Sequence, residues 1–543
     1  MRSILLTLLI PVCLLFSAED EKADYYKELS DNIKLYFDIL LTLNENYVDT
    51  VNIEEMMSEG IKAMLSTTDP YTVLLKESEV DHYTELSSGT YGGIGIYLGT
   101  SGPEKRLTVI SPMDDTPASK VGLKAGDMIM YINEKETKGI STKDASDYLR
   151  GDPGTKVTLK IKRPGRNDLL NFSLTRARIN ILNVPYSEVI DGSVGYIKLT
   201  QFTATSYYDF VKEFEILVSQ GVKSLIIDLR YNPGGLLESA VKHTSAFLPK
   251  NKLVVSTKGR GDRIDNEYLT QLTPLDTEIP VAVLINNSSA SASEIFAGAL
   301  QDHDRAVIVG ERSFGKGLVQ QLFDVGMMKK RNMKVTVRKY YTPNGRLIQK
   351  EDYFGDRSEN ENDTVFFSSL NNKRKMPSGT GILPDVFVEE AKDTDYISFL
   401  KMNNLFSDFL YNFYLKNPDY KFKGINDGIV QKFKDYIASS GFRYESRDLL
   451  LADSLLSYSR TNDYPSDLIK NLEETREKLA GNVSGNFEKN IDRIKHNLAI
   501  EFGVYTNGNK EKYRIMNTKD PVIAKAKEIL KDKVEYKSIL GYK

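Results

Sequence analysis

Short apolar runs separated by helical stripes predict a repeated strand, helix, strand unit in residues 194 to 310. The run Val281–Ile285 has the length and flanking residues of a buried strand, and three similar runs precede or follow it. They are Tyr196–Leu199, Leu225–Leu229 and Ala306–Val309. The pattern predicts an α/β core around a largely parallel sheet. Periodicity alone does not distinguish among the folds of this class.

Residues 89 to 178 have a different pattern, of short strands and glycine turns. Val157, Leu159 and Ile161 alternate with polar residues, and glycines recur in the segment Gly122–Asp127. The pattern resembles a PDZ domain, which binds a peptide as an added strand and holds its terminal carboxylate with loop N–H groups. The resemblance assigns peptide binding to a loop formed by Gly93, Ile94, Gly95 and Ile96.

Helical patterns flank these regions. In residues 19 to 88, Ile33 and Phe37 lie on one apolar helical face and Ile53–Met64 forms a second helix, which together predict a packed helical cap. Residues 391 to 543 are rich in Lys and Glu and predict a helical extension whose apolar stripes pack inward. Substrate capture, a partner surface and structural capping are alternative roles for this extension.

The N-terminal segment Met1–Ala18 predicts a secretory signal peptide. Arg2 precedes the apolar run Ile4–Phe16, which is too short to span a bilayer comfortably, and acidic residues follow. The only cysteine, Cys13, lies inside this run, so the mature chain is expected to contain no disulfide. We expect a periplasmic or secreted protein, or a membrane-associated one if the signal is not cleaved.

Composition excludes some classes of function. The chain is 41% hydrophobic and 27% charged, which is ordinary for a soluble protein, and 543 residues imply several domains. The net charge of −3 provides no basic field for nucleic acid.

Candidate chemistry lies between Pro280 and Gln320. Asn, Ser and Ala follow the strand Val281–Ile285, and a helical stripe begins near Glu294. Such a turn places a serine beside the N–H groups of a helix N-terminus, which attract developing negative charge. Ser291 is therefore the candidate nucleophile, although most serines in turns are structural.

A serine hydroxyl needs a base to take its proton. His303 lies roughly three helical turns beyond Ser291, which carries it away from the turn. Lys316 lies between Gly315 and Gly317, where the backbone can approach other groups closely. Burial would lower its pKa and leave a neutral amine. The pattern favours a Ser-Lys dyad that needs no metal or cofactor.

A phosphate-binding loop is the competing interpretation, because Gly310–Lys316 matches G-x-x-x-x-G-K. That loop requires Ser or Thr next, and the chain has Gly317. The loop also opens a helix, whereas Leu318–Val325 predicts a strand. Nucleotide binding is therefore not favoured.

Three separated segments resemble, in the expected order, the signature of the C-terminal processing peptidases, the tail-specific serine proteases. They are Ser289–Glu294 (SASASE), Gly310–Gly317 (GERSFGKG) and Val319-Gln320. The resemblance implies that Ser291 is the nucleophile, that Lys316 is the general base and that Gln320 orients the lysine.

The segment Asp228–Gly235 (DLRYNPGG) resembles the oxyanion loop of the same family. Adjacent glycines let backbone N–H groups point into a cleft, which a tetrahedral oxyanion requires. The resemblance assigns this role to the N–H of Ala292 and to that of either Gly234 or Gly235.

The expected fold is multidomain α/β, with a crotonase-like or ClpP-like protease core, an inserted PDZ domain, and helical N- and C-terminal regions. Polar residues 351 to 378 are expected to form a loop. The expected domains are 1–18 (signal peptide), 19–88 (N-terminal helical region), 89–178 (PDZ), 179–390 (protease core) and 391–543 (C-terminal helical extension).

The resulting functional prediction is a serine endopeptidase that binds protein or peptide substrates through their C-termini and cleaves near those ends. It is also expected to form a homodimer through its helical regions. The alternative is a catalytically silent PDZ scaffold, which would not need a lysine placed for proton transfer.

Arg150 follows the predicted helix Thr142–Leu149 and is a candidate regulatory residue. In this hypothesis, tail binding lets Arg150 contact the Gln320 region and align Lys316. The alternative is a solvated arginine that is favourable at a helix end.

Overall fold

The computed structural model describes residues 9–75, 77–101, 105–113, 115–163, 166, 168–260, 264–326, 331–350, 365–417, 419–442, 444, 447–483 and 486–542. The chain divides into two compact units, residues 1–76 with 320–336 and residues 77–319 with 337–543. Residues 1–8 of the expected signal peptide lie outside the described residues. No helix in the described part of the chain is long and apolar enough to cross a membrane.

The first unit contains two helices and a small antiparallel sheet. Helix α1 (Leu9–Asn46) continues without a break through the expected signal cleavage site, and α2 (Ile53–Ser66) begins at the N-cap Asn52. The short strand β1 (Val73–Leu75), which the helical prediction missed, pairs with β18 (Arg331–Tyr341), and β17 (Leu318–Val325) also pairs with β18.

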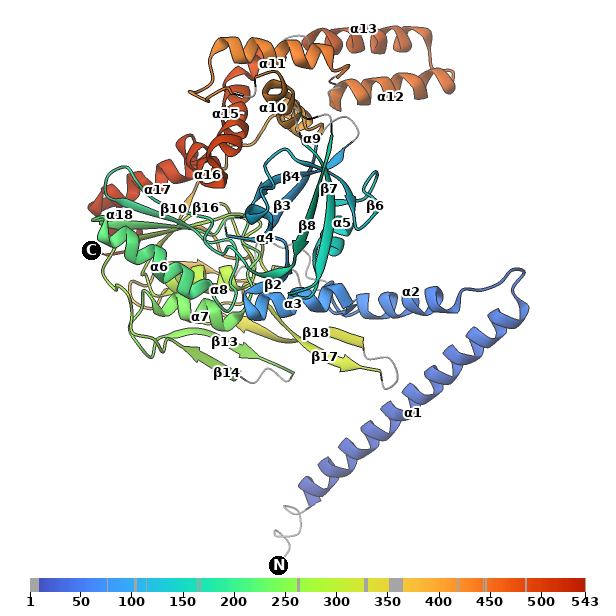
Figure 1. The fold of residues 1–543 in the computed structure, drawn as a ribbon. Helices are drawn as coiled ribbons and strands as arrows, with labels where there is room; N and C mark the ends of the chain where they lie inside the picture. The colour runs from blue at the N-terminus through green and yellow to red at the C-terminus, as the bar shows by residue number, and fades with distance from the viewer. Residues whose placement is uncertain are drawn as a thin grey trace, which may run out of the picture. The chain divides into compact units, whose positions relative to one another are not determined.

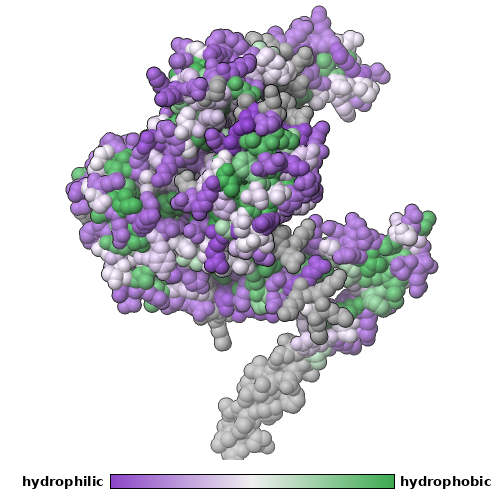
Figure 2. All heavy atoms as spheres, viewed as in Figure 1, coloured by the Kyte–Doolittle hydropathy of each residue, from purple (hydrophilic) through white to green (hydrophobic). Residues whose placement is uncertain are grey.

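An apolar surface lies on α1, and it corrects the expectation of a packed cap. Ile33 and Phe37 are 61% and 59% exposed, and Tyr26, Leu29 and Leu41 are also exposed. Figure 2 shows hydrophobic residues gathered on the described part of this helix. The helical prediction is therefore confirmed, but this face is not buried within the chain.

The second unit is built around a six-stranded sheet with the order β10-β11-β12-β15-β16-β21. Its strands are β10 (Tyr186–Ile190), β11 (Val194–Lys198), β12 (Ser224–Asp228), β15 (Val281–Ile285), β16 (Val307–Gly310) and β21 (Val386–Phe387). The pairs from β11 to β21 are parallel, and only β10 runs antiparallel to its neighbour. The predicted parallel sheet is confirmed.

Alternate side chains of these strands point into two different apolar layers. Ile227 and Val283 pack with residues of α6 (Ser206–Ser219), α7 (Leu237–Ser245) and α8 (Ala292–Asp302). Ile226 and Leu284, one position away, pack with residues of α17 (Pro521–Lys531) and α18 (Lys533–Ile539). Because neighbouring strand residues face opposite sides, the sheet is buried on both faces. In Figure 1, α17 and α6 to α8 lie on opposite sides of it.

Smaller elements complete the core region. Strands β13 (Leu253–Lys258) and β14 (Ile264–Leu269) are antiparallel, and β13 also pairs with residues 339–341 of β18. In the described part of residues 351–378, β19 (Phe366–Ser368) and β20 (Lys375–Pro377) form a hairpin, so the loop prediction is wrong there. Residues 351–364 lie outside the described residues.

Residues 77 to 180 form a second sheet with its own apolar core. The sheet has the order β3-β4-β5-β7-β8, with β6 added to β5, and β2 pairs with β9. The elements are α3 (Glu77–Ser88), β2 (Thr90–Gly93), β3 (Ile96–Ser101), β4 (Arg106–Pro112), α4 (Pro117–Lys120), β5 (Met128–Ile132), β6 (Lys135–Glu136), α5 (Thr142–Leu149), β7 (Lys156–Lys162), β8 (Leu169–Thr175) and β9 (Ala177–Asn180). The helix predicted at Thr142–Leu149 is confirmed, and β3 is an edge strand.

Residues beyond 394 are helical, as predicted. The helices before α17 are α9 (Asp395–Met402), α10 (Leu405–Lys416), α11 (Asp427–Ser439), α12 (Arg447–Thr461), α13 (Ser466–Val483), α14 (Asn486–Lys489), α15 (Ile491–Asn507) and α16 (Asn509–Thr518). Helices α9 to α11 pack with α15 around aromatic residues such as Phe433 and Phe502. Ile494 and Leu498 are fully buried there, which confirms their predicted packing role.

Candidate active site

The turn between β15 and α8 places Ser291 at the helix N-terminus. Strand β15 has the predicted bounds, and α8 begins at Ala292, directly after the serine. Ser291 has φ 56° and ψ −114°, a region that a residue with a side chain seldom occupies. Such strain persists only where the surroundings fix it, and it occurs often at active sites.

The buried carboxylate of Glu294 holds this turn against the Lys316 loop. Its Oε2 accepts the N–H of Ser291 at 2.8 Å and the N–H of Lys316 at 2.9 Å. Its Oε1 accepts the N–H of Gly315 at 2.7 Å and the hydroxyl of Ser313 at 2.5 Å. One side chain therefore bonds to the backbones of both predicted dyad residues.

Burial raises the pKa of Glu294 to about 7, although these four donors oppose the shift. Glu294 was not among the site residues predicted from the sequence. The available signal was the pattern Ser291-x-x-Glu294, because a glutamate three residues after an N-cap serine bonds back to the N-cap N–H.

The hydroxyl of Tyr340 forms a second connection between the same two backbones. It lies 3.2 Å from the carbonyl oxygen of Ser291 and donates to the carbonyl oxygen of Lys316. Tyr340 is 1% exposed, and its own N–H donates to the carbonyl of Gly317 at 2.9 Å. Nothing in the sequence around Tyr340 pointed to this contact.

The glycines beside Lys316 are required by close packing. A Cβ on Gly315, where φ is +89°, would lie 2.6 Å from the Lys350 Cβ, and one on Gly317 would lie 2.8 Å from the Gln349 nitrogen. The structure thus brings the backbones of Ser291 and Lys316 together. Gln320 belongs to the other compact unit, where its Nε2 donates to Thr336 Oγ1 at 3.4 Å.

His303 lies at the opposite end of α8 from Ser291, as predicted. It is the C-cap residue of the helix, and its Nε2 lies 2.8 Å from the Leu253 carbonyl oxygen. The strand predicted at Leu318–Val325 is also confirmed as β17, in place of the helix that a phosphate-binding loop requires.

The predicted oxyanion loop lies directly against the serine turn. A Cβ on Gly234 would be 2.6 Å from the Ala290 oxygen, 2.8 Å from the Ala292 nitrogen and 2.9 Å from the Ser291 Cβ. The N–H of Gly234 donates to Asn232 Oδ1 at 2.9 Å. Among the described residues, no acceptor is found for the N–H of Gly235 or Ala292. The geometry thus favours Gly235 over Gly234 as the available donor.

Asn232 connects the loop to its surroundings on several sides. Its Nδ2 donates to the Leu199 carbonyl at 2.9 Å. Its own carbonyl accepts the N–H of Ala290 at 3.1 Å and the hydroxyl of Ser293 at 2.9 Å. Asn232 is fully buried, so these bonds fix the spacing between the glycines and the serine turn.

A buried charge cluster lies at the base of this loop. Asp228 bonds to Lys198 at 3.0 Å, to the Tyr196 hydroxyl at 2.7 Å and to Arg230 at 2.7 Å. Burial alone would raise the pKa of Asp228, but the charges of Arg230 and Lys198 outweigh it and hold that pKa below its ordinary value. Asp228 therefore stays ionised.

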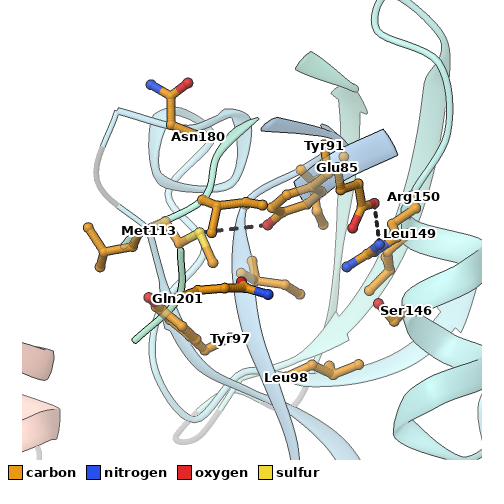
Figure 3. Close-up of a pocket in the computed structure, with 16 residues that line it drawn as sticks. Glu85, Tyr91, Tyr97, Leu98, Met113, Ser146, Leu149, Arg150, Asn180 and Gln201 are labelled. Carbon is orange, nitrogen blue, oxygen red and sulfur yellow. Dashed lines mark hydrogen bonds and ion pairs between the residues drawn. The ribbon is translucent and has the colours of Figure 1, made fainter. Parts of the chain in front are cut away.

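The predicted peptide loop forms part of the wall of a pocket of about 350 Å³. Gly93, Ile94, Gly95 and Ile96 all line it, together with Arg150 and with Gln201 from the core region. Figure 3 shows that the Arg150 guanidinium points toward Glu85, with which it forms an ion pair. Arg150 also lies over the Tyr91 ring, at 4.9 Å from its centroid. Arg150 is therefore a pocket residue and not a freely solvated helix end.

No group of three or more His, Cys, Asp or Glu side chains within the described ranges is placed to hold a metal ion.

Comparison with known proteins gives three matches along the chain. Residues 193–355 match Peptidase family S41, residues 108–163 match a PDZ domain, and residues 396–530 match the probable PDZ-protease C-terminal helical domain.

Several carboxy-terminal processing proteases are similar over most of their length. The one from Bartonella bacilliformis is 35% identical over 375 residues, which cover 68% of this chain and 77% of the relative. The one from Synechocystis is 36% identical over 316 residues, 57% of this chain and 72% of the relative. The solved photosystem II D1 C-terminal processing protease is 26% identical, covering 65% of this chain and 86% of its own, with a TM-score of 0.36.

Proposed function

The chain belongs to peptidase family S41, the carboxy-terminal processing proteases, and we propose that it cleaves protein substrates near their C-terminal tails with a Ser291–Lys316 dyad. The main support for this dyad is the Glu294 carboxylate, which accepts hydrogen bonds from the backbone N–H groups of both residues. A binding scaffold without catalysis would not need the strained Ser291 backbone.

In the proposed mechanism, the neutral amine of Lys316 takes the Ser291 proton as Oγ attacks the scissile carbonyl carbon. The N–H groups of Gly235 and Ala292 donate to the resulting oxyanion. Lys316 then gives the proton to the leaving amine, and water hydrolyses the acyl-enzyme by the same route in reverse. Gln320 orients the lysine amine.

The pocket of about 350 Å³ is the proposed site for the substrate tail. The edge strand β3 would accept the tail as an added strand, and the loop of Gly93, Ile94, Gly95 and Ile96 would hold its carboxylate. We propose that the tail displaces Arg150 from Glu85, so that Arg150 acts on the Gln320 region and couples tail binding to cleavage.

For the core, we propose the crotonase-like or ClpP-like arrangement, which a sheet covered by helices on both faces supports.

We also propose export to the periplasm or secretion through residues 1–18, with membrane association if that segment is retained. The apolar face of α1 supports dimerisation through the N-terminal helices.

The direct test is incubation of the purified chain with an unstructured reporter protein that carries an apolar C-terminus. Mass spectrometry should identify products cut near that end, and a reporter with an acidic C-terminus should be cut more slowly. Equal cleavage of both reporters would contradict tail recognition, and no cleavage of either would contradict the proposed activity.

A further inference from the structure

The N-cap residue of α17, Asp520, contacts the oxyanion loop across nearly 300 residues of sequence. Its Oδ2 lies 2.8 Å from Nη1 of Arg230, whose side chain is 7% exposed. Its Oδ1 accepts the N–H groups of Val522 and Ile523 at 2.9 and 3.1 Å. The two oxygens thus have separate tasks, one in capping the helix and one in binding the arginine.

Helix α17 is fixed in place by the sheet that it covers. Val522, Ile523 and Ala526 are at most 1% exposed and pack in the same apolar layer as Ile226 and Leu284. The position of Asp520 therefore follows from burial of this helix face, and the carboxylate does not depend on a flexible loop.

The other side of the Arg230 guanidinium binds Asp228, with Nη2 at 2.7 Å from Oδ2. Asp228 is shared with Lys198, and the third nearby carboxylate, Glu390, lies farther from Arg230 at 3.3 Å. Asp520 thus provides Arg230 with its second close anion, and the guanidinium is held between two carboxylates from distant parts of the chain.

Arg230 lies four and five residues before Gly234 and Gly235, in the same loop as the proposed oxyanion donor. Its N–H donates to Asp228 Oδ1 at 2.9 Å, and its carbonyl accepts Lys198 Nζ at 2.7 Å. The next residue, Tyr231, has a positive φ of 60° and donates its N–H to Asn286 Oδ1 at 3.0 Å. Displacement of Arg230 would therefore be transmitted to Gly234 and Gly235.

We propose that Asp520 is a positioning residue for the oxyanion hole, through which the C-terminal helical region sets the geometry of the active site. This inference rests on the proposed peptidase function. Loss of the Asp520 charge should slow the chemical step and leave tail binding unchanged, because the tail pocket contains neither Asp520 nor Arg230.

The test compares Asp520→Asn with Asp532→Asn in the full-length protein. Asparagine caps a helix as well as aspartate does, so the first change removes the charge beside Arg230 and keeps the cap. Asp532 is the matched control, because it caps α18 by accepting the N–H groups of Val534 and Glu535 and is exposed. A third variant, Asp520→Glu, restores the charge.

For Asp520→Asn we expect kcat for the tailed reporter to fall roughly tenfold or more, because small misplacements of catalytic groups are costly, with KM within about twofold. The variant should keep the circular dichroism spectrum of the wild type, and Asp520→Glu should recover part of kcat. Equal kcat in the two asparagine variants would overturn the inference while leaving the peptidase function intact. An inactive wild-type protein would overturn both.

Discussion

Gly234 lies so close to Ser291 that a Cβ atom added to the glycine would come within 2.9 Å of the serine Cβ. The same added atom would lie 2.8 Å from the Ala292 nitrogen and would cover one of the two proposed oxyanion donors. The close approach of these two segments makes the proposed oxyanion hole sensitive to a single methyl group.

Gly234→Ala is therefore expected to lower kcat by about 10²- to 10³-fold, the usual effect of losing one oxyanion donor. Steady-state kinetics on the tailed reporter measure it, with KM nearly unchanged. Gly221→Ala is the matched control, because Gly221 also has a positive φ, +86°, but a Cβ there would meet nothing within 4 Å. Equal losses in both variants would assign the effect to backbone strain alone.

Ser291→Ala and Lys316→Ala should each abolish cleavage, because each removes one half of the proposed dyad. Both variants should keep the circular dichroism spectrum of the wild type, since each change shortens a side chain and keeps the backbone N–H groups that bond to Glu294. Substantial activity in either correctly folded variant would contradict the dyad.

Glu294 should make the free energy of unfolding depend on pH. Burial raises its folded pKa from 4.5 to about 7, so the folded protein binds the proton more tightly than the unfolded chain does. The resulting stabilisation is complete below the unfolded pKa and is lost as pH rises through about 7.

Urea unfolding at pH 5 and pH 8 can measure this, with the nontitrating variant Glu294→Gln as reference. The stability of the wild type relative to the variant should fall by a few kcal/mol between the two pH values, since one pKa unit corresponds to about 1.4 kcal/mol. A relative stability that rises with pH would show that hydrogen bonding to the carboxylate outweighs burial.

Glu294→Gln should also lose much of its kcat, because an amide cannot accept four donors.

Arg150→Ala should slow cleavage of tailed reporters if Arg150 couples tail binding to the dyad. Tail affinity, measured by titration in a Ser291→Ala background, should change little. Arg166→Ala is the control, because that arginine pairs with Asp168 on the exposed surface of the same domain. An unchanged cleavage rate, or a loss of rate explained wholly by weaker tail binding, would contradict the coupling.

Phe37→Glu should weaken dimerisation if the exposed apolar face of α1 forms the interface. Light scattering across a range of protein concentrations should show more monomer than in the wild type. Thr42→Glu also adds a negative charge, but this exposed residue lies five positions from Phe37, on a different side of the same helix, so the change should have little effect. A wild-type protein that stays monomeric throughout would remove the dimer hypothesis.

Local hydrophobic patterns in the sequence predicted much of the fold. The bounds of β15, α5 and β17 follow the predicted runs because each has a clear period and clear ends. The short strands β1 and β19 were missed, since three residues give no measurable period. The exposure of Ile33 and Phe37 also could not be read from their spacing, which is the same for a buried face and for one that awaits a partner.

Contacts between distant segments account for the parts of the site that the sequence did not predict. Glu294 had a local signal, its spacing from Ser291. The contact of Tyr340 with the Lys316 carbonyl and that of Asp520 with Arg230 depend on the folding of separate segments. Nothing near residue 520 in the sequence distinguishes its aspartate from an ordinary helix cap.

The two-sided burial of the central sheet also bears on how the protein is made. The strands from β11 to β16 and the helices of one face are complete once residue 310 has been synthesised, but α17, which covers the other face, begins only at Pro521. A growing chain must therefore carry an uncovered apolar sheet through the synthesis of more than two hundred further residues. Arg230 also lacks its Asp520 partner during that time, so in a nascent or truncated chain the segment proposed to form the oxyanion hole would be incompletely supported.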